Sequence, residues 1–281
     1  MFYSCMQFLI QNGHEIIALF SGTPKSGEYD STQNASKQAQ MLGIPIMRSR
    51  PASEDIKDLG QKGCDALIAA GYPYKIPKWQ ETGIKYGINI HPSLLPQGAG
   101  PMPLPFIITK GLKKSGVTLH ELSPKWDAGN IVLQESFPLF SQENIENLLI
   151  KNQKLAVILL RQFLESPEKH WANSTPQIHQ DGDYWPMPDP KAFVVDYTQE
   201  LEMISRYMRA HRYINPAGDI EFISGISFWE QDHGFTPGTI LLQDNGMNLV
   251  AVAKGVIRFK LETKPSPKHT FVTPKCISSE V

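Results

Sequence analysis

Short apolar runs alternate with amphipathic segments through the first two-thirds of the chain, and this alternation constrains the fold more than any other feature. The strand-like runs are residues 15–20, 44–47, 65–70, 87–90, 116–120 and 131–135, and helical segments at residues 3–11, 33–42 and 53–61 separate the first of them. Ser53 is the expected N-cap of the third helix. Strands that alternate with helices at this spacing predict an α/β, Rossmann-like domain around a mostly parallel sheet.

The chain begins directly on a helical segment, with no strand before it. An α/β domain normally opens with a strand that leads through a turn into the first helix. An unfilled central strand position would leave backbone donors and acceptors unpaired in the core. Either the true start lies upstream of Met1 or domains of this kind tolerate the loss, and we expect the upstream start.

The last third of the chain has a different character. A long helix is predicted from Ser141, with an apolar stripe formed by Ile145, Leu148, Leu149, Leu155, Leu159 and Phe163. Five prolines between residues 166 and 190 indicate a linker, after which come one helix and four short strands with an Asn245-Gly246 turn signal. The predicted division is a catalytic domain at residues 1–170, a linker at 171–195 and a small β-rich, barrel-like domain at 196–281. Arg209 and Arg212, at the end of the helix, could form a contact patch, but solvated helix charges are the commoner case, and we expect them to be solvated.

Composition excludes several classes of protein. The 281 residues carry 27 Lys and Arg against 28 Asp and Glu, which argues against a protein built mainly to bind nucleic acid. The longest apolar run, Leu155–Leu160, is six residues, whereas a membrane span needs about 20. The three cysteines have no metal-ligand spacing, as expected of reduced thiols. These features predict a cytoplasmic protein without a membrane partner.

A polar cluster between residues 89 and 130 is the most informative part of the sequence. Asn89 and His91 flank Ile90 at the end of an apolar strand, so their side chains lie on the same face. His120 ends the next strand, and Asp127 follows seven residues later. Open α/β sheets place their sites at the carboxyl ends of strands.

These residue types suit acyl transfer to an amine. Asn89 would donate a hydrogen bond to the oxyanion of a tetrahedral intermediate, and His91 with Asp127 would accept the proton of the attacking amine. Spacing alone leaves other interpretations open, because a strand-end His or Asn is more often structural. A zinc site of His91, His120 and Asp127 lacks the usual ligand spacing, and a triad with Ser93 as nucleophile lacks a nucleophile elbow.

Three motifs in this stretch resemble the folate-dependent formyltransferases, a family that includes glycinamide ribonucleotide, methionyl-tRNA and amino-sugar formyltransferases. They are Asn-x-His-x-Ser-Leu-Leu-Pro at residues 89–96, Gly-Val-Thr-x-His at 116–120 and Asp-x-Gly at 127–129. The resemblance implies transfer of a formyl group from 10-formyltetrahydrofolate to an amine. It also implies catalytic roles for Asn89, His91 and Asp127 and no metal. The donor would bind along a loop containing Tyr72, Tyr74 and Ile76, and His120 would contact the acceptor substrate.

Several residues differ from the family pattern, and these differences indicate which kind of acceptor substrate the chain uses. The tRNA enzymes usually carry a basic loop where this chain has residues 21–34, with one Lys and two acids, and a basic group is replaced within residues 97–100. The C-terminal domain resembles that of methionyl-tRNA formyltransferase, yet residues 181–281 hold 10 Lys and Arg against 13 Asp and Glu. We therefore expect a small-molecule amine, most simply a nucleotide-linked amino sugar. Methionyl-tRNA is a disfavoured alternative acceptor. A third hypothesis is a folate-binding protein without catalytic activity. Homodimerisation is left open.

Overall fold

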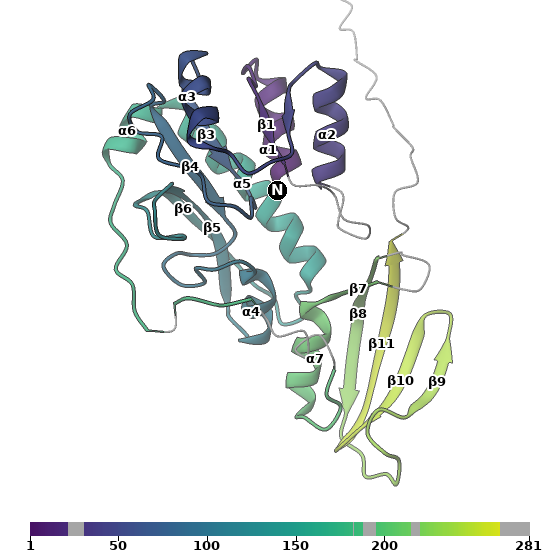
Figure 1. Ribbon diagram of the computed structural model, residues 1–281. Coiled ribbons are helices and arrows are strands. Elements are labelled where there is room, and N and C mark those ends of the chain that lie inside the picture. The colour runs from purple at the N-terminus through teal and green to yellow at the C-terminus, as the bar shows by residue number, and fades with distance from the viewer. Residues whose placement is uncertain (22–30, 182, 188–194, 215–219, 265–281) are drawn as a thin grey trace, which may run out of the picture.

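The computed structural model describes residues 1–21, 31–181, 183–187, 195–214 and 220–264 (Figure 1). The N-terminal part combines short strands with helices, which confirms the α/β class. Its helices are α1 (Phe2–Gln11), α2 (Ser31–Met41), α3 (Ser53–Gln61), α4 (Pro103–Thr109), α5 (Ile145–Glu165) and α6 (Pro167–Ala172). Its strands are β1 (Leu19–Phe20), β2 (Ile46–Met47), β3 (Ala66–Ala69), β4 (Tyr86–His91), β5 (Lys114–Glu121) and β6 (Ile131–Pro138).

These strands form two sheets. β1 pairs with β2 in parallel, and a separate sheet has the order β3-β4-β5-β6. Within the second sheet only β3 and β4 are parallel, whereas β5 runs antiparallel to both β4 and β6. The second sheet is therefore mixed rather than mostly parallel. Its last two strands, β5 and β6, are joined by a short loop and so run in opposite directions. The register places Asn89 directly opposite His120.

The main core lies between the second sheet and α5. Ile88 and Ile90 of β4 pack with Val117 and Leu119 of β5, and Leu148, Leu159 and Phe163 on the predicted stripe of α5 are almost fully buried. The helix begins at Ile145 rather than Ser141, because the Asn144 side chain caps it by accepting from Asn147 N at 2.9 Å. At α3 the N-cap is Ala52 rather than Ser53, and Asp55 Oδ2 accepts from the Ala52 amide at 2.7 Å.

The C-terminal part is an antiparallel sheet with one helix against it. Helix α7 (Leu201–Ala210) precedes β7 (Arg212–Ile214), β8 (Ile220–Trp229), β9 (Ile240–Asp244), β10 (Met247–Val252) and β11 (Gly255–Lys264), in the sheet order β7-β8-β11-β10-β9. Asn245 and Gly246 form the predicted two-residue turn, with φ of 47° and 81°. Among the described residues no helix is long and apolar enough to cross a membrane.

The prediction that Arg209 is solvated was wrong. Its side chain is buried, and Nη1 donates to the Glu143 carbonyl at 2.7 Å. Arg209 therefore links α7 to the N-terminal part just before α5. Helical spacing alone gives no sign of this contact, which spans 66 residues of sequence.

Candidate active site

Four polar side chains converge at the carboxyl end of β4. Asp127 Oδ1 lies 3.6 Å from His91 Nδ1, 3.6 Å from His120 Nε2 and 3.5 Å from Asn89 Nδ2. Asn89 Nδ2 is also 3.0 Å from His120 Nε2. The structure thus brings all three predicted catalytic residues, and the predicted substrate-binding His120, into one group centred on the Asp127 carboxylate.

The loop between β5 and β6 holds Asp127 in an unusual backbone conformation. Its φ is 50°, in the left-handed region that few residues other than Gly, Asn and Asp adopt. The Gly100 amide donates to Oδ2 at 2.9 Å, and Gln177 Nε2 donates to the Asp127 carbonyl at 2.9 Å. Burial by itself would raise the pKa of Asp127, but the His120 contact, the nearby His91 and the Gly100 amide together hold it below its usual value. Asp127 is therefore a carboxylate at neutral pH.

His91 is held in one orientation by the loop that follows β4. Its ring is 5% exposed, and Nε2 donates to the Gly98 carbonyl at 2.8 Å. Burial lowers the pKa of His91, although Asp127 and the Gly98 carbonyl partly offset it. Because Nε2 carries the hydrogen, the neutral ring presents the Nδ1 lone pair to the site.

The orientation of His120 follows from a backbone contact. Nδ1 lies 2.9 Å from the Glu121 carbonyl, which can only accept, so Nδ1 donates. On the other side of the ring, Nε2 is hydrogen-bonded to Asn89 Nδ2 at 3.0 Å and lies 3.6 Å from Asp127 Oδ1. This hydrogen bond connects the amide directly to the second histidine across the β4–β5 pair.

A large cavity opens in front of this group. Its volume is about 1040 Å³, and it is lined by Asn89, His91, His120 and Asp127 together with Tyr72, Tyr74 and Ile76. The loop residues predicted to bind the donor therefore face the same space as the polar group. The rings of Tyr72 and Tyr74 pack edge to face at 5.6 Å, and the Tyr72 hydroxyl is buried without a partner among the described residues. An apolar cavity with a few convergent polar groups fits a flat heteroaromatic donor such as a folate.

The sequence did not predict that the segment at residues 177–185 contacts the loops that carry the site. Gln177 donates to the carbonyls of Asp127 and Gly129, at 2.9 and 2.6 Å. Further along, the Gly98 amide donates to Asp183 O, and the Trp185 amide donates to Ala99 O. The segment predicted as a linker thus contacts the loops that carry the site, and no local signal in a proline-rich stretch indicates such contacts.

Within the described residues no group of three His, Cys, Asp or Glu side chains could hold a metal ion. The loop at residues 21–34, on which the argument against tRNA partly rests, falls largely outside the described residues.

Comparison with known proteins adds to this geometry. A family model described as formyl transferase matches residues 2–164, more than half of the chain. The methionyl-tRNA formyltransferase of Anaplasma marginale (strain St. Maries) is 31% identical over 211 residues, which cover 73% of this chain and 69% of that protein. The chain belongs to the formyl transferase family, whose formyl donor is 10-formyltetrahydrofolate.

Solved structures share the fold at low sequence identity. The sugar 3N-formyl transferase WlaRD, crystallised with dTDP and 5-N-formyl-THF, has a TM-score of 0.66 and 17% identity, covering 92% of this chain and 93% of that one. An N-formyltransferase from Helicobacter canadensis, in complex with folinic acid and dTDP-3-aminofucose, has a TM-score of 0.67 and 16% identity, covering 92% and 95%. The formyltransferase fold therefore extends over nearly the whole chain.

Proposed function

We propose that the chain transfers a formyl group from 10-formyltetrahydrofolate to the primary amine of a small metabolite, a nucleotide-linked amino sugar. The observation that carries the proposal is the convergence of Asn89, His91, His120 and Asp127 at one end of the 1040 Å³ cavity. Such a site needs no protein nucleophile, because the acceptor amine attacks the formyl carbon itself.

Each residue has a role that its contacts support. Asn89 lines the cavity, and the amide hydrogen that lies towards Asp127 Oδ1, at the longer distance of 3.5 Å, would turn to stabilise the negative charge that develops on the formyl oxygen. Asp127, ionised and surrounded by three nitrogen-bearing side chains, attracts the proton that the amine loses as it attacks. His91, whose Nδ1 lies 3.6 Å from Oδ1, would relay this proton to N10 of the folate as the bond between N10 and the formyl carbon breaks and tetrahydrofolate leaves. The bound folate supplies only the activated formyl group.

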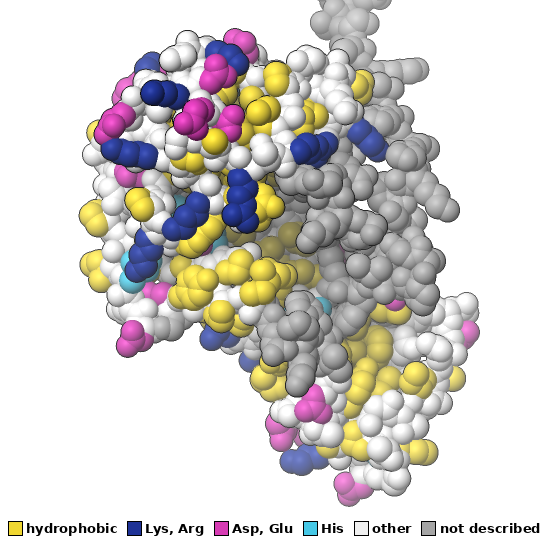
Figure 2. All heavy atoms as spheres, in the orientation of Figure 1, with side chains coloured by type: hydrophobic (Ala, Val, Ile, Leu, Met, Phe, Trp, Pro, Cys, Tyr) yellow, Lys and Arg dark blue, Asp and Glu magenta, His cyan; other side chains and the backbone are white. Residues whose placement is uncertain are grey.

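The charge of the C-terminal part favours a small acceptor over tRNA. Residues 181–281 have a net charge of −3, from 10 Lys and Arg against 13 Asp and Glu, whereas binding to a polyanion depends on phosphate neutralisation. On the face shown in Figure 2, the described residues of the C-terminal sheet carry few Lys or Arg side chains.

The rim of the cavity has groups suited to a nucleotide. Trp126 is 47% exposed there, with Lys75 Nζ 5.5 Å from its ring centroid. An exposed indole beside a lysine offers a stacking surface for a base and a charge for a phosphate. The two sugar formyltransferases of similar fold were crystallised with dTDP or a dTDP-sugar, which agrees with this acceptor class.

Methionyl-tRNA is the second candidate, because the sequence relatives quoted above and others at 26–30% identity are methionyl-tRNA formyltransferases. A parallel assay separates the two candidates. The purified protein is incubated with 10-formyltetrahydrofolate and either dTDP-amino sugars or methionyl-initiator tRNA, and formylated product is measured by mass spectrometry.

Formylation of an amino-sugar nucleotide supports the proposal, and formylation of methionyl-tRNA alone overturns the acceptor assignment. Binding of 5-formyltetrahydrofolate without transfer to any amine would favour a non-catalytic protein. In the active reaction, Asn89→Ala should lower turnover by about 100-fold, the usual effect of removing one oxyanion donor. Asn144→Ala, which removes only a helix cap, is the control for stability.

A further inference from the structure

Residues 98–100 form a short stretch of backbone on which two of the proposed catalytic residues depend. His91 Nε2 donates to the Gly98 carbonyl at 2.8 Å, and the Gly100 amide donates to Asp127 Oδ2 at 2.9 Å. Both contacts are made by main-chain atoms of this stretch, so they depend on where its backbone lies. Whatever fixes residues 98–100 therefore also fixes His91 and Asp127.

A second segment, residues 183–185, lies along this backbone, and we call it the strap. The Gly98 amide donates to Asp183 O at 2.8 Å, and the Trp185 amide donates to Ala99 O at 2.7 Å. These bonds use the Gly98 amide and the Ala99 carbonyl, which are not the main-chain groups that contact the catalytic side chains. The strap therefore holds the backbone without competing for those contacts.

Trp185 anchors the strap in the core. Its side chain is 4% exposed and lies in the apolar cluster where α4, α5 and α7 meet (Figure 1). The centroid of its ring lies 5.7 Å from that of Phe106, and Lys110 Nζ lies 5.6 Å from the same centroid. A large aromatic side chain in a close-packed interior has few alternative positions. The strap is therefore held by contacts with three helices as well as by its own hydrogen bonds.

Trp185 also packs against both glycines of the 98–100 backbone. A Cβ at Gly98 would lie 2.9 Å from Trp185 Cζ3, and a Cβ at Gly100 would lie 2.0 Å from the Trp185 carbonyl oxygen. The backbone therefore has no room to shift toward the strap. Removal of the ring would open space beside Gly98, the residue whose carbonyl orients His91.

The neighbouring side chain has a different environment. Tyr184 is 58% exposed and, with Met187, borders the 1040 Å³ cavity, whereas Trp185 is not among the residues that line it. A bound substrate can thus contact Tyr184 but does not reach the Trp185 ring. An effect of Trp185 on the reaction must therefore pass through the backbone that it holds.

We propose that Trp185 is a positioning residue for formyl transfer, and that by anchoring the strap to residues 98–100 it sets the orientation of His91 and of the Asp127 carboxylate. The inference rests on the proposed function. Because a misplacement of about 1 Å can greatly slow a reaction, Trp185→Ala should lower kcat by about 30-fold or more. The KM for either substrate should change by less than about threefold, since Trp185 does not line the cavity. Trp185→Phe, which keeps an aromatic ring beside Gly98, should retain at least about a third of kcat.

The tautomer of His91 is a readout that does not require turnover. In the intact protein the hydrogen lies on Nε2, where the Gly98 carbonyl accepts it. The ¹⁵N chemical shifts of the ring are measured at about pH 8, where a histidine is neutral, and are assigned by their loss in His91→Asn. They should show this tautomer alone in the intact protein and in Trp185→Phe, and a mixture of both tautomers in Trp185→Ala.

Ile145→Val is the matched control for stability, because Ile145 belongs to the same apolar cluster but not to the strap. It should leave kcat and the His91 tautomer unchanged. If Trp185→Ala does not fold, Trp185→Leu replaces it, since leucine keeps apolar volume but lacks the flat ring. In an Asp127→Asn background, Trp185→Ala should lower kcat further by less than about threefold, because it acts through His91 and Asp127.

A single His91 tautomer in Trp185→Ala overturns the inference, whether or not the chain transfers formyl groups. A loss of kcat that multiplies fully with that of Asp127→Asn, or an equal loss in Ile145→Val, overturns it as well. If the intact protein transfers no formyl group, the proposed function fails, and the tautomer comparison still decides whether Trp185 positions His91.

Discussion

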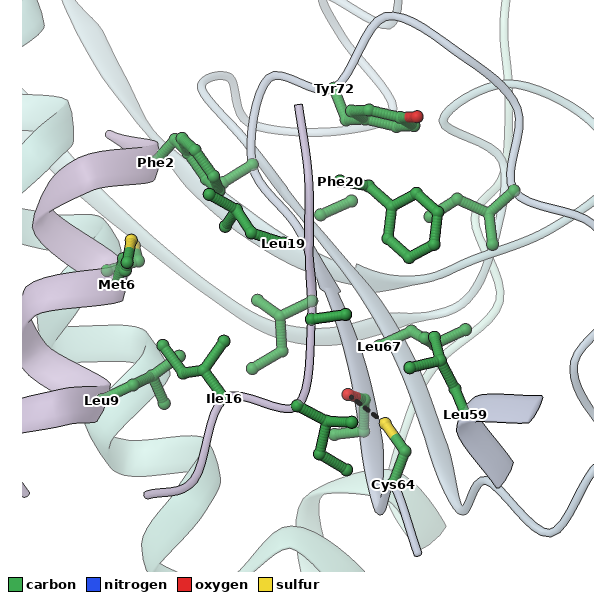
Figure 3. A pocket seen from close by; sticks show the side chains of 18 of the residues that line it. Phe2, Met6, Leu9, Ile16, Leu19, Phe20, Leu59, Cys64, Leu67 and Tyr72 are labelled. Carbon is green, nitrogen blue, oxygen red and sulfur yellow. Dashed lines mark hydrogen bonds between the residues drawn. The ribbon is translucent and has the colours of Figure 1, made fainter. Parts of the chain in front are cut away.

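The carboxyl end of the β4–β5 pair and the strand cleft, a cavity of about 550 Å³ bordered by residues 14–21 and 63–73 (Figure 3), are built in opposite ways. In the first region the strands are paired, and Asn89, His91, His120 and Asp127 all have hydrogen-bond partners. In the second region, strand edges face an apolar cavity of about 550 Å³ without backbone pairing between them. The polar site is thus supported by paired strands, and Met1, Ala69 and the loop at residues 71–76 border both cavities.

The largest expected effect tests the polar region. Asp127→Asn should lower turnover by about 1000-fold or more, because an amide neither attracts the amine proton nor accepts equally from the surrounding nitrogens. Binding of 5-formyltetrahydrofolate, measured by calorimetry, should change only a few-fold. The matched control is Asp58→Asn, at an exposed ion pair with Lys62 on α3, which should leave turnover unchanged. Similar losses in both variants would contradict the assigned role of Asp127.

The next prediction compares packing in the two regions. Ile88→Ala, in the complete core, should lower the free energy of unfolding by about 4 kcal/mol, and Ile56→Ala, beside the strand cleft, by only about 2 kcal/mol. Ile56 already borders unfilled volume, so its truncation removes fewer contacts. Urea unfolding measures both values. Equal costs at the two positions would mean that the cleft is closed in solution.

A smaller effect is expected at Gly100, which lies between the catalytic loop and residue 185. Its φ is 129°, and a Cβ there would lie 2.0 Å from the Trp185 carbonyl. Gly100→Ala should therefore displace the amide that holds Asp127 and lower turnover by about tenfold, since only one of several contacts to Asp127 weakens. Gly13→Ala is the control, because Gly13 also has a positive φ, of 78°, but open space around it. It should cost about 1–2 kcal/mol of stability and leave turnover unchanged.

The smallest effect is the pH dependence of stability. The pKa of His91 is lowered in the folded state by burial, so the unfolded chain binds a proton near pH 6.5 that the folded chain binds only at lower pH. The free energy of unfolding should therefore fall as the pH drops below about 6.5. Asp127, with its lowered pKa, adds a further loss as the pH falls below about 3.9. Urea unfolding at several pH values should give a flatter profile between about pH 6.5 and pH 5 for His91→Asn than for the unsubstituted protein.

Local patterns predicted the elements of the fold well. Helix α3 has the predicted bounds, and the stripe on α5 is buried as expected. Asn89 and His91 face the same cavity because side chains in a strand alternate between two faces, which is a property of neighbouring residues. The exact caps at Ala52 and Asn144 were missed, because several residues near a helix start can serve as a cap.

Contacts between distant segments were not predicted. Gln177 bonds to Asp127 across 50 residues, and Arg209 bonds to Glu143 across 66. Neither residue type nor its local spacing indicates a partner so far away. The antiparallel direction of β5 was missed for the same reason, because strand direction depends on how a connection packs and not on the apolar pattern within the strand.

The sequence by itself determined the alternation of strands and helices and the family motifs around residues 89–129. These features depend on periodicity, turn residues and residue order, which are local. Only the tertiary structure decided that His120 lies opposite Asn89, that Gln177 and Gly100 hold Asp127, and that a cleft with two free strand edges lies beside Cys5 and Cys64. The register of strands and the position of cavities depend on how segments far apart in the chain pack together. Each strand must pair its backbone groups and bury its side chains against all of its neighbours, and these neighbours are distant in sequence.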